Sequence, residues 1–229
     1  MDDSVLVLRT VSKNMVSYNG FTWPKSGYAE AKDWQPTFNC GNGLHGLLWG
    51  EGNGTYLDWS NEAVWLVVKV EKKNLLTGEG HLKDKCKFKC GDIVHCGNQK
   101  SATNYMQKNG ENGKVITGIT ATAGDSGTAT VGDYGTVTAG DYGTATAGDY
   151  GTVTAGDYGT ATAGDRGTAT AGYGGTATAG DYGTLILKFW DSKNNRQRIK
   201  VFYIGEDGAK ANVAYKQGED GNKIIEVEK

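Results

Sequence analysis

The sequence predicts a mainly β protein, with a β-solenoid of four 16-residue coils between a small α+β domain and an all-β cap. Three observations lead to this fold class. Eight consecutive octapeptides fill residues 120–183, strand and turn signals alternate through residues 184–229, and residues 1–115 hold five of the six Trp and all four Cys. We expect domains at residues 1–115, 116–183 and 184–229.

Each octapeptide follows the pattern Thr-Ala-Thr-Ala-Gly-Asp-Tyr-Gly, from Thr120 to Gly183. Alternate residues of a strand face opposite sides. If the Thr residues face outward, the second and fourth positions face inward, and these positions exchange Ala only for Val. The Gly-Asp-Tyr-Gly segment is typical of a turn. Eight residues cannot close a coil, so we expect two octapeptides per coil, as the 16-residue spacing of Val137 and Val153 also indicates.

The flanking segments predict shorter elements. In the first domain, residues 5–11 and 64–70 are expected strands, residues 26–33 an expected short helix with Ser26 as its N-cap, and residues 107–117 the linker into the solenoid. In the cap, a hairpin is expected at residues 184–190 and 198–204, with further strands at residues 211–215 and 223–227.

Composition excludes several classes of protein. A formal net charge of −2 lacks the basic excess of a general nucleic-acid binder, and 38% hydrophobic residues exclude global disorder. The N-terminus is acidic where a secretory signal is basic, and no apolar run approaches about 18 residues. We therefore expect a cytoplasmic protein with no membrane contact and no direct nucleic-acid binding.

The acidic excess lies on the repeat, which carries a net charge of −6 while each flanking segment carries +2. With 16-residue coils the Asp side chains stack in two columns, Asp125, Asp141 and Asp157 at one corner and Asp133, Asp149, Asp165 and Asp181 at the other. Each Asp could cap its own turn. Alternatively, the columns form an anionic face for a partner protein with a basic surface.

The Tyr residues of the repeat also fall into columns beside the Asp residues. Their positions are Tyr134, Tyr150 and Tyr182, with Arg166 in the same column, and Tyr142 and Tyr158 in the other. Stacked aromatic side chains pack over backbone and can also dock against a second copy. The sequence therefore predicts a homodimer, with the Asp and Tyr columns as the partner-binding residues.

The glycine-rich segment 41–52 is the densest candidate for a small-ligand site, because Gly lets a ligand approach the backbone. Its His-Gly pair resembles the nicotinamide-contacting segment of ADP-ribosyltransferases. That resemblance implies a dinucleotide site with His45, Trp49 and Glu51 as ligand contacts, although no catalytic Glu can be assigned. A tight turn with a packed His is the alternative.

A Cys and His cluster offers a zinc hypothesis, with Cys86, Cys90, His95 and Cys96 within eleven residues. The spacing lacks the usual Cys-x2-Cys element. Because Cys86, Phe88 and Cys90 share one strand face and the intervening lysines the other, reduced core cysteines are the preferred interpretation. We therefore predict no metal site. The sequence also shows no recognisable catalytic motif, and we predict no cofactor and no catalytic residues.

The Thr-Ala-Thr arrays resemble the octapeptide repeats of bacterial ice nucleation proteins. The resemblance covers residues 120–183 and implies a water-ordering, ice-binding surface at Thr136, Thr138, Thr152, Thr154 and their stacked neighbours. Exposed Thr is also a good strand former without any such role.

The whole arrangement, with its cap at residues 203–215, resembles phage and prophage proteins. This resemblance implies a non-enzymatic interaction module in the host cytoplasm. The preferred prediction is an inhibitor of a host defence or nucleic-acid-binding protein that acts through the acidic solenoid. Ice binding and dinucleotide binding are the alternatives.

Overall fold

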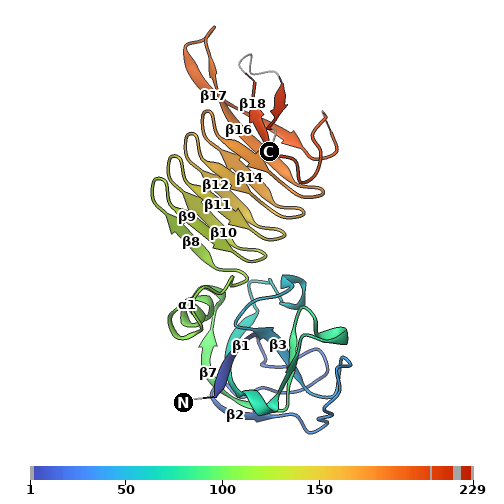
Figure 1. The fold of residues 1–229 in the computed structure, drawn as a ribbon. Coiled ribbons are helices and arrows are strands. Elements are labelled where there is room, and N and C mark those ends of the chain that lie inside the picture. Colours follow the sequence, from blue (N-terminus) through green and yellow to red (C-terminus); the bar gives the residue numbers. More distant parts are fainter. Residues whose placement is uncertain (1–2, 207, 219–222, 228–229) are drawn as a thin grey trace. The chain divides into compact units, whose positions relative to one another are not determined.

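The computed structural model describes residues 3–206, 208–218 and 223–227, which form two compact units, Met1–Ile119 and Thr120–Lys229 (Figure 1). Each unit has its own sheets, and each is described by itself. In the part of the chain that the structure describes, no helix is long and apolar enough to cross a membrane.

The first unit is built on a seven-stranded sheet with the order β2-β7-β4-β1-β3-β6-β5, in which every pair is antiparallel. Its strands are β1 (Ser4–Val11), β2 (Gly27–Glu30), β3 (Leu44–Leu48), β4 (Val64–Glu71), β5 (Leu75–Thr77), β6 (Cys86–Phe88) and β7 (Cys90–Gly97). Short 3-10 turns lie at Gly54–Tyr56, Lys72–Asn74 and Gly80–Leu82.

Helix α1 (Gln99–Asn109) follows β7 directly. Asn98 caps its first turn, because the Asn98 side chain accepts a hydrogen bond from the Ser101 N–H and the Ser101 side chain accepts one from the Asn98 N–H. Ala102 and Met106 are buried on its inner face. The helix therefore includes residues 107–109, which the sequence assigned to a linker.

Residues 26–33 are also not helical, contrary to the sequence prediction. Residues 27–30 form edge strand β2, paired with β7, in which Ala29 is buried between exposed neighbours. Ala29 and Ala31 join the core around Trp23 and Phe88. Burial with period two therefore outweighed the local N-cap signal of Ser26.

The second unit opens with the solenoid, whose two sheets we call sheet I and sheet II. Sheet I contains β8 (Thr120–Ala123), β10 (Thr136–Ala139), β12 (Thr152–Ala155) and β14 (Thr168–Ala171). Sheet II contains β9 (Thr128–Val131), β11 (Thr144–Ala147), β13 (Thr160–Thr162) and β15 (Thr176–Thr178). Neighbouring strands of each sheet are parallel, and Val137 pairs with Val153.

The cap continues both sheets, with a parallel strand followed by an antiparallel one in sheet I and with antiparallel strands in sheet II. In sheet I, β16 (Thr184–Asp191) pairs with β14 and then forms a hairpin with β17 (Arg196–Tyr203). In sheet II, β18 (Tyr215–Gln217) and β19 (Ile224–Glu226) follow β15. The predicted hairpin is therefore confirmed. Residues 211–212 form a turn and residues 213–214 have no regular structure, so the strand expected at residues 211–215 begins only at Tyr215.

These features confirm the predicted fold class. The structure is mainly β, with a solenoid of about four coils, a small N-terminal unit that includes helix α1, and a cap of C-terminal strands. The inward Ala and Val residues form the solenoid core, in which Val137, Ala145 and Val153 have no solvent exposure.

Candidate functional site

The most regular surface of the molecule is the outer face of sheet I, where two Thr residues of each strand point to solvent. We call it Thr face I; its residues are Thr120, Thr122, Thr136, Thr138, Thr152, Thr154, Thr168 and Thr170. Parallel pairing sets each Thr opposite the same Thr of the next coil. The rows are therefore about 4.8 Å apart across strands and about 6.6 Å apart along them.

The equivalent surface of sheet II is less open. We call it Thr face II; its residues are Thr128, Thr130, Thr144, Thr146, Thr160, Thr162, Thr176 and Thr178. Six of the eight Thr residues on face I are exposed, whereas on face II only the two of β9 are exposed and the rest are half-buried. The two faces share one sequence pattern but differ in how much hydroxyl and methyl surface they offer to solvent.

The array is held by hydrogen bonds that run from coil to coil. Six of the seven Asp residues of the repeat, all but Asp181, accept through Oδ1 a hydrogen bond from the backbone N–H sixteen residues later. Asp149 Oδ1, for example, lies 2.9 Å from the Asp165 nitrogen. We call this series of bonds the Asp ladder. The series runs from Asp125 to Tyr173 in one column and from Asp133 to Asp181 in the other. The sequence suggested that each Asp could cap its own turn; the structure shows that these carboxylates bond to the backbone of the next coil.

The corner residues also stack along the solenoid axis. The Tyr134 and Tyr150 rings lie parallel with centroids 4.7 Å apart, and the Tyr142 and Tyr158 rings 5.2 Å apart. Arg166 lies between Tyr150 and Tyr182, with its guanidinium 5.5 Å from each ring centroid, and it donates a hydrogen bond to the Tyr150 hydroxyl. These contacts give the corner side chains a packing role within a single chain.

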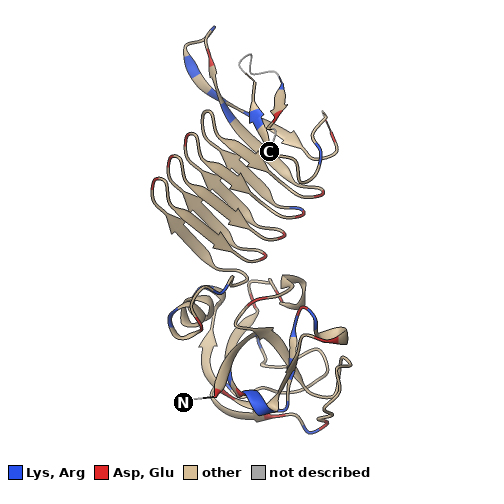
Figure 2. Cartoon of the chain, in the orientation of Figure 1, with Lys and Arg blue, Asp and Glu red and all other residues tan. Residues whose placement is uncertain are grey.

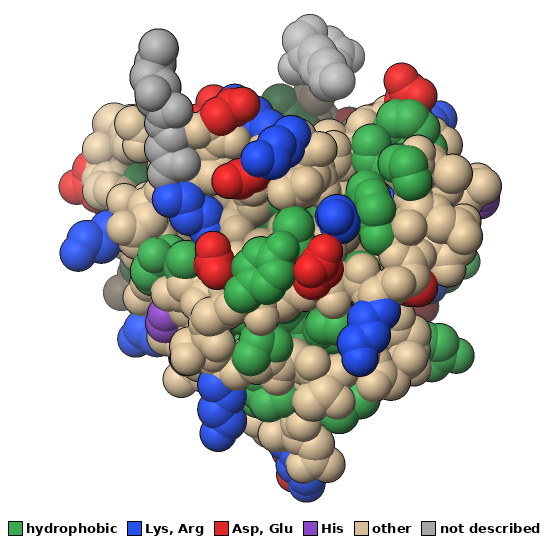
Figure 3. Space-filling view, turned by 90° about the horizontal axis from the view of Figure 1, so that it is seen from below, with side chains coloured by type: hydrophobic (Ala, Val, Ile, Leu, Met, Phe, Trp, Pro, Cys, Tyr) green, Lys and Arg blue, Asp and Glu red, His purple; other side chains and the backbone are tan. Residues whose placement is uncertain are grey.

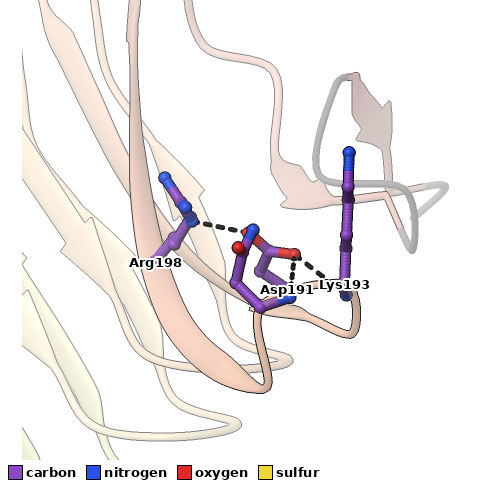
Figure 4. Close-up of polar contacts among 4 residues, drawn as sticks. Asp191, Lys193 and Arg198 are labelled. Atoms are coloured by element: carbon purple, nitrogen blue, oxygen red, sulfur yellow. Dashed lines mark hydrogen bonds and ion pairs between the residues drawn. The ribbon is translucent and has the colours of Figure 1, made fainter.

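Charged side chains mark the corners and the cap. Figure 2 shows acidic residues at the turns of the solenoid and basic residues on the β16–β17 hairpin. Asp191 fixes the hairpin turn, because its carboxylate accepts hydrogen bonds from the Lys193 and Asn194 N–H groups and pairs with Arg198 Nε at 2.6 Å (Figure 4). Figure 3 shows the molecule from below, with both signs of charge interspersed on that face.

The three predicted ligand-binding residues of the first unit, His45, Trp49 and Glu51, each make a different contact within that unit. His45 lies on β3, where its carbonyl accepts a hydrogen bond from Arg9. Trp49 follows β3 with a φ of 56°, and its backbone N–H donates a hydrogen bond to the Leu6 carbonyl. Glu51 accepts the Val115 N–H and pairs with Lys114 at 3.3 Å. These contacts hold the turn after β3 and the segment after α1.

Cys86 and His95, two members of the Cys and His cluster, make separate contacts within the first unit. The Cys86 thiol is buried and donates to the Gly46 carbonyl, and burial raises the pKa of Cys86 to about 12. His95 shares a hydrogen bond of 2.9 Å with the Ser101 hydroxyl and stacks on Tyr105. Among the described residues, no group of three or more His, Cys, Asp or Glu side chains is placed to hold a metal ion.

Lys87 departs from the expected solvent-facing position of the lysines between these cysteines. It is fully buried, and its ammonium donates to the Asn39 and Gly41 carbonyls and lies over the Trp34 ring. The loop around Cys40 folds over this lysine, and sequence alternation alone gave no signal of that loop.

Comparison with known proteins gives two separate matches. Residues 5–108 match the family described as "Domain of unknown function (DUF7666)". Curated relatives include ice nucleation proteins of Pseudomonas fluorescens (38% identical over 107 residues), Pantoea ananas (36% over 105 residues) and Xanthomonas campestris pv. translucens (37% over 109 residues).

These matches cover just under half of this chain, and they span 9%, 10% and 7% of the three relatives. No solved structure matches the chain. The relatives support the resemblance of the repeats to ice nucleation proteins. The sequence had named Thr residues of sheet I for that role, but it gave no ranking of the two Thr faces; their difference in exposure emerges only from the structure.

Proposed function

We propose that Thr face I orders water and binds ice. The observation that carries the proposal is the in-register array of exposed Thr residues on sheet I. Each Thr offers a methyl group and a hydroxyl at a fixed place, because inward Ala and Val pack the strands from below and the Asp ladder ties the coils together. A fixed array holds water in repeated positions without losing side-chain freedom when ice binds.

Relatives named ice nucleation proteins add support to the proposal. The matched regions span only about a tenth of these relatives, which are far longer than this chain. Any activity of the four-coil solenoid would therefore come from a small surface. We expect that surface to adsorb to existing ice and to slow its growth, since a short array covers few lattice positions.

The test compares the same substitution on the two faces. Thr138→Lys with Thr154→Lys alters face I, and Thr146→Lys with Thr162→Lys alters the same repeat positions on face II. We expect the face I variant to lose thermal hysteresis and partition out of growing ice, and the face II variant to retain both. Equal behaviour of the two variants, or no ice adsorption by the unaltered protein, would overturn the proposal.

The other sequence predictions stay predictions. A basic surface on a host protein as partner, a homodimer, a phage origin and a cytoplasmic location have no support beyond the residues that suggested them. The Asp columns that motivated the first of these have a structural role in the coil-to-coil ladder. Ice binding by Thr face I is therefore the function that we prefer.

A further inference from the structure

The turn of the seventh octapeptide, residues 168–175, differs in sequence from the turns of the others. It reads Gly172-Tyr173-Gly174-Gly175, so Tyr replaces the Asp of the other seven repeats and Gly replaces the residue that follows. The Asp ladder does not require this change, because the Tyr173 N–H still donates a hydrogen bond to Asp157 Oδ1 at 2.8 Å. The substitution removes one carboxylate and one corner side chain at this place.

The altered turn lies at a cleft between the solenoid and the cap. The cleft has a volume of about 460 Å³ and is lined by Tyr158 and Tyr173 of the corners, Phe189 and Trp190 of the hairpin, and Lys216 and Gln217 of β18, with Lys188 also on its wall. That volume is in the range of small-molecule sites. In Figure 1 the β16–β17 hairpin and β18 lie at the same end of the second unit.

The glycine at position 174 keeps the cleft open. A Cβ at Gly174 would lie 2.7 Å from the Tyr158 ring. The Tyr158 ring therefore occupies the space that a side chain at position 174 would fill. Tyr173 meets Tyr158 edge-on, with an interplanar angle of 86°, where the other Tyr pairs of the corners are parallel. The column of stacked rings thus ends in two aromatic surfaces that face the cleft.

The cleft combines aromatic rings with two lysine side chains. Tyr158, Tyr173 and Trp190 are 52%, 40% and 43% exposed, an unusual gathering of aromatic surface around one hollow. Among the residues that the structure describes, neither Lys188 nor Lys216 forms an ion pair with an acidic side chain, and no Asp or Glu lines the cleft. With the regular repeat, an Asp at position 173 would have added a negative charge here.

From this arrangement we infer that the cleft binds a nucleoside phosphate. The flat base stacks on the tyrosine and tryptophan rings, and the phosphate pairs with the two lysine ammonium groups. Stacking of a base on an aromatic side chain contributes about 1–3 kcal/mol, and it requires no particular base edge. The site is separate from Thr face I, and its occupancy does not depend on ice binding.

The test uses isothermal titration calorimetry of the full chain with AMP, adenosine and ribose 5-phosphate. AMP should bind at least about tenfold more tightly than either fragment, because only AMP has both the base and the phosphate. Absence of binding by AMP at millimolar concentration, or equal binding by ribose 5-phosphate, would overturn the inference.

Two variants locate the binding. Tyr173→Asp restores the regular repeat, which folds in the seven other octapeptides, and it should weaken AMP binding about tenfold by removing a ring and adding a like charge to the phosphate. Lys216→Met should weaken AMP binding but not adenosine binding. The control is Lys193→Met, which removes a charge from the hairpin turn outside the cleft. AMP binding that is unchanged by Tyr173→Asp, or reduced equally by Lys193→Met, would place the ligand elsewhere.

Discussion

At the scale of single residues, inward and outward positions of the solenoid differ sharply in what they tolerate. Val137 has no solvent exposure, whereas its neighbour Thr136 is exposed. We expect Val137→Asp to lower the free energy of unfolding by about 3 kcal/mol or more, because it buries a charge without a partner. Thr136→Asp should change it by less than about 0.5 kcal/mol. Urea unfolding followed by circular dichroism measures both; equal effects would contradict the inward and outward assignment.

His45 should make the stability of the first unit depend on pH. Burial, followed by the positive charges of Lys85, Arg9 and Lys87, lowers the pKa of His45 from 6.5 to about 4. The unfolded chain therefore binds this proton at a higher pH than the folded chain, and the free energy of unfolding should fall as the pH drops from about 6.5 to about 4. Above that window His45 is neutral in both states and contributes nothing.

The measurement is a series of urea titrations across this pH range. His45→Gln should reduce the slope of stability against pH, while His81→Gln, at an exposed position, serves as the control. An unchanged slope in His45→Gln would show that other groups set the pH dependence.

At the scale of elements, the turns between strands carry a steric requirement that differs between coils. A Cβ at Gly148 would lie 2.2 Å from Asp133 Oδ1 of the preceding coil, whereas a Cβ at Gly124 has nothing within 4 Å because no coil precedes it. Gly148→Ala should therefore cost about 1–3 kcal/mol of stability, and Gly124→Ala less than about 0.5 kcal/mol. Thermal unfolding of the two variants provides the comparison, and similar midpoints would contradict the ladder.

The elements also show how far a sequence can predict this molecule. The octapeptides fix coil length, inward positions and parallel register, because the period of the sequence is the period of the structure. In the first unit, strands such as β1 and β4 follow from apolar runs, but β2 was mistaken for a helix and Lys87 for a surface residue. Those two depend on contacts with β7 and with the loop at residues 39–41, which are distant in the sequence. The difference between the Thr faces also depends on packing that no single repeat encodes.

At the scale of the whole molecule, coil number sets the size of the candidate surface. Insertion of a second copy of residues 136–151 adds one strand to each sheet and keeps every column in register. We expect the longer protein to remain folded, because each coil contacts only its neighbours, and to adsorb to ice more strongly than the original. Thermal hysteresis at equal molar concentration measures this. The same insert with Lys in place of its Thr138 equivalent is the control, and equal activity of both would contradict the surface.

The hydrogen bonds of the Asp ladder run along the solenoid axis, so they are loaded one coil at a time when the chain is pulled from its ends. A molecule stretched between its two termini should then yield by peeling, with a succession of small force peaks in place of one large rupture. Each 16-residue coil releases about 50 Å of contour length. Optical-tweezer traces of the second unit should show that step, and removal of one carboxylate by Asp149→Ala should lower a single peak in the series.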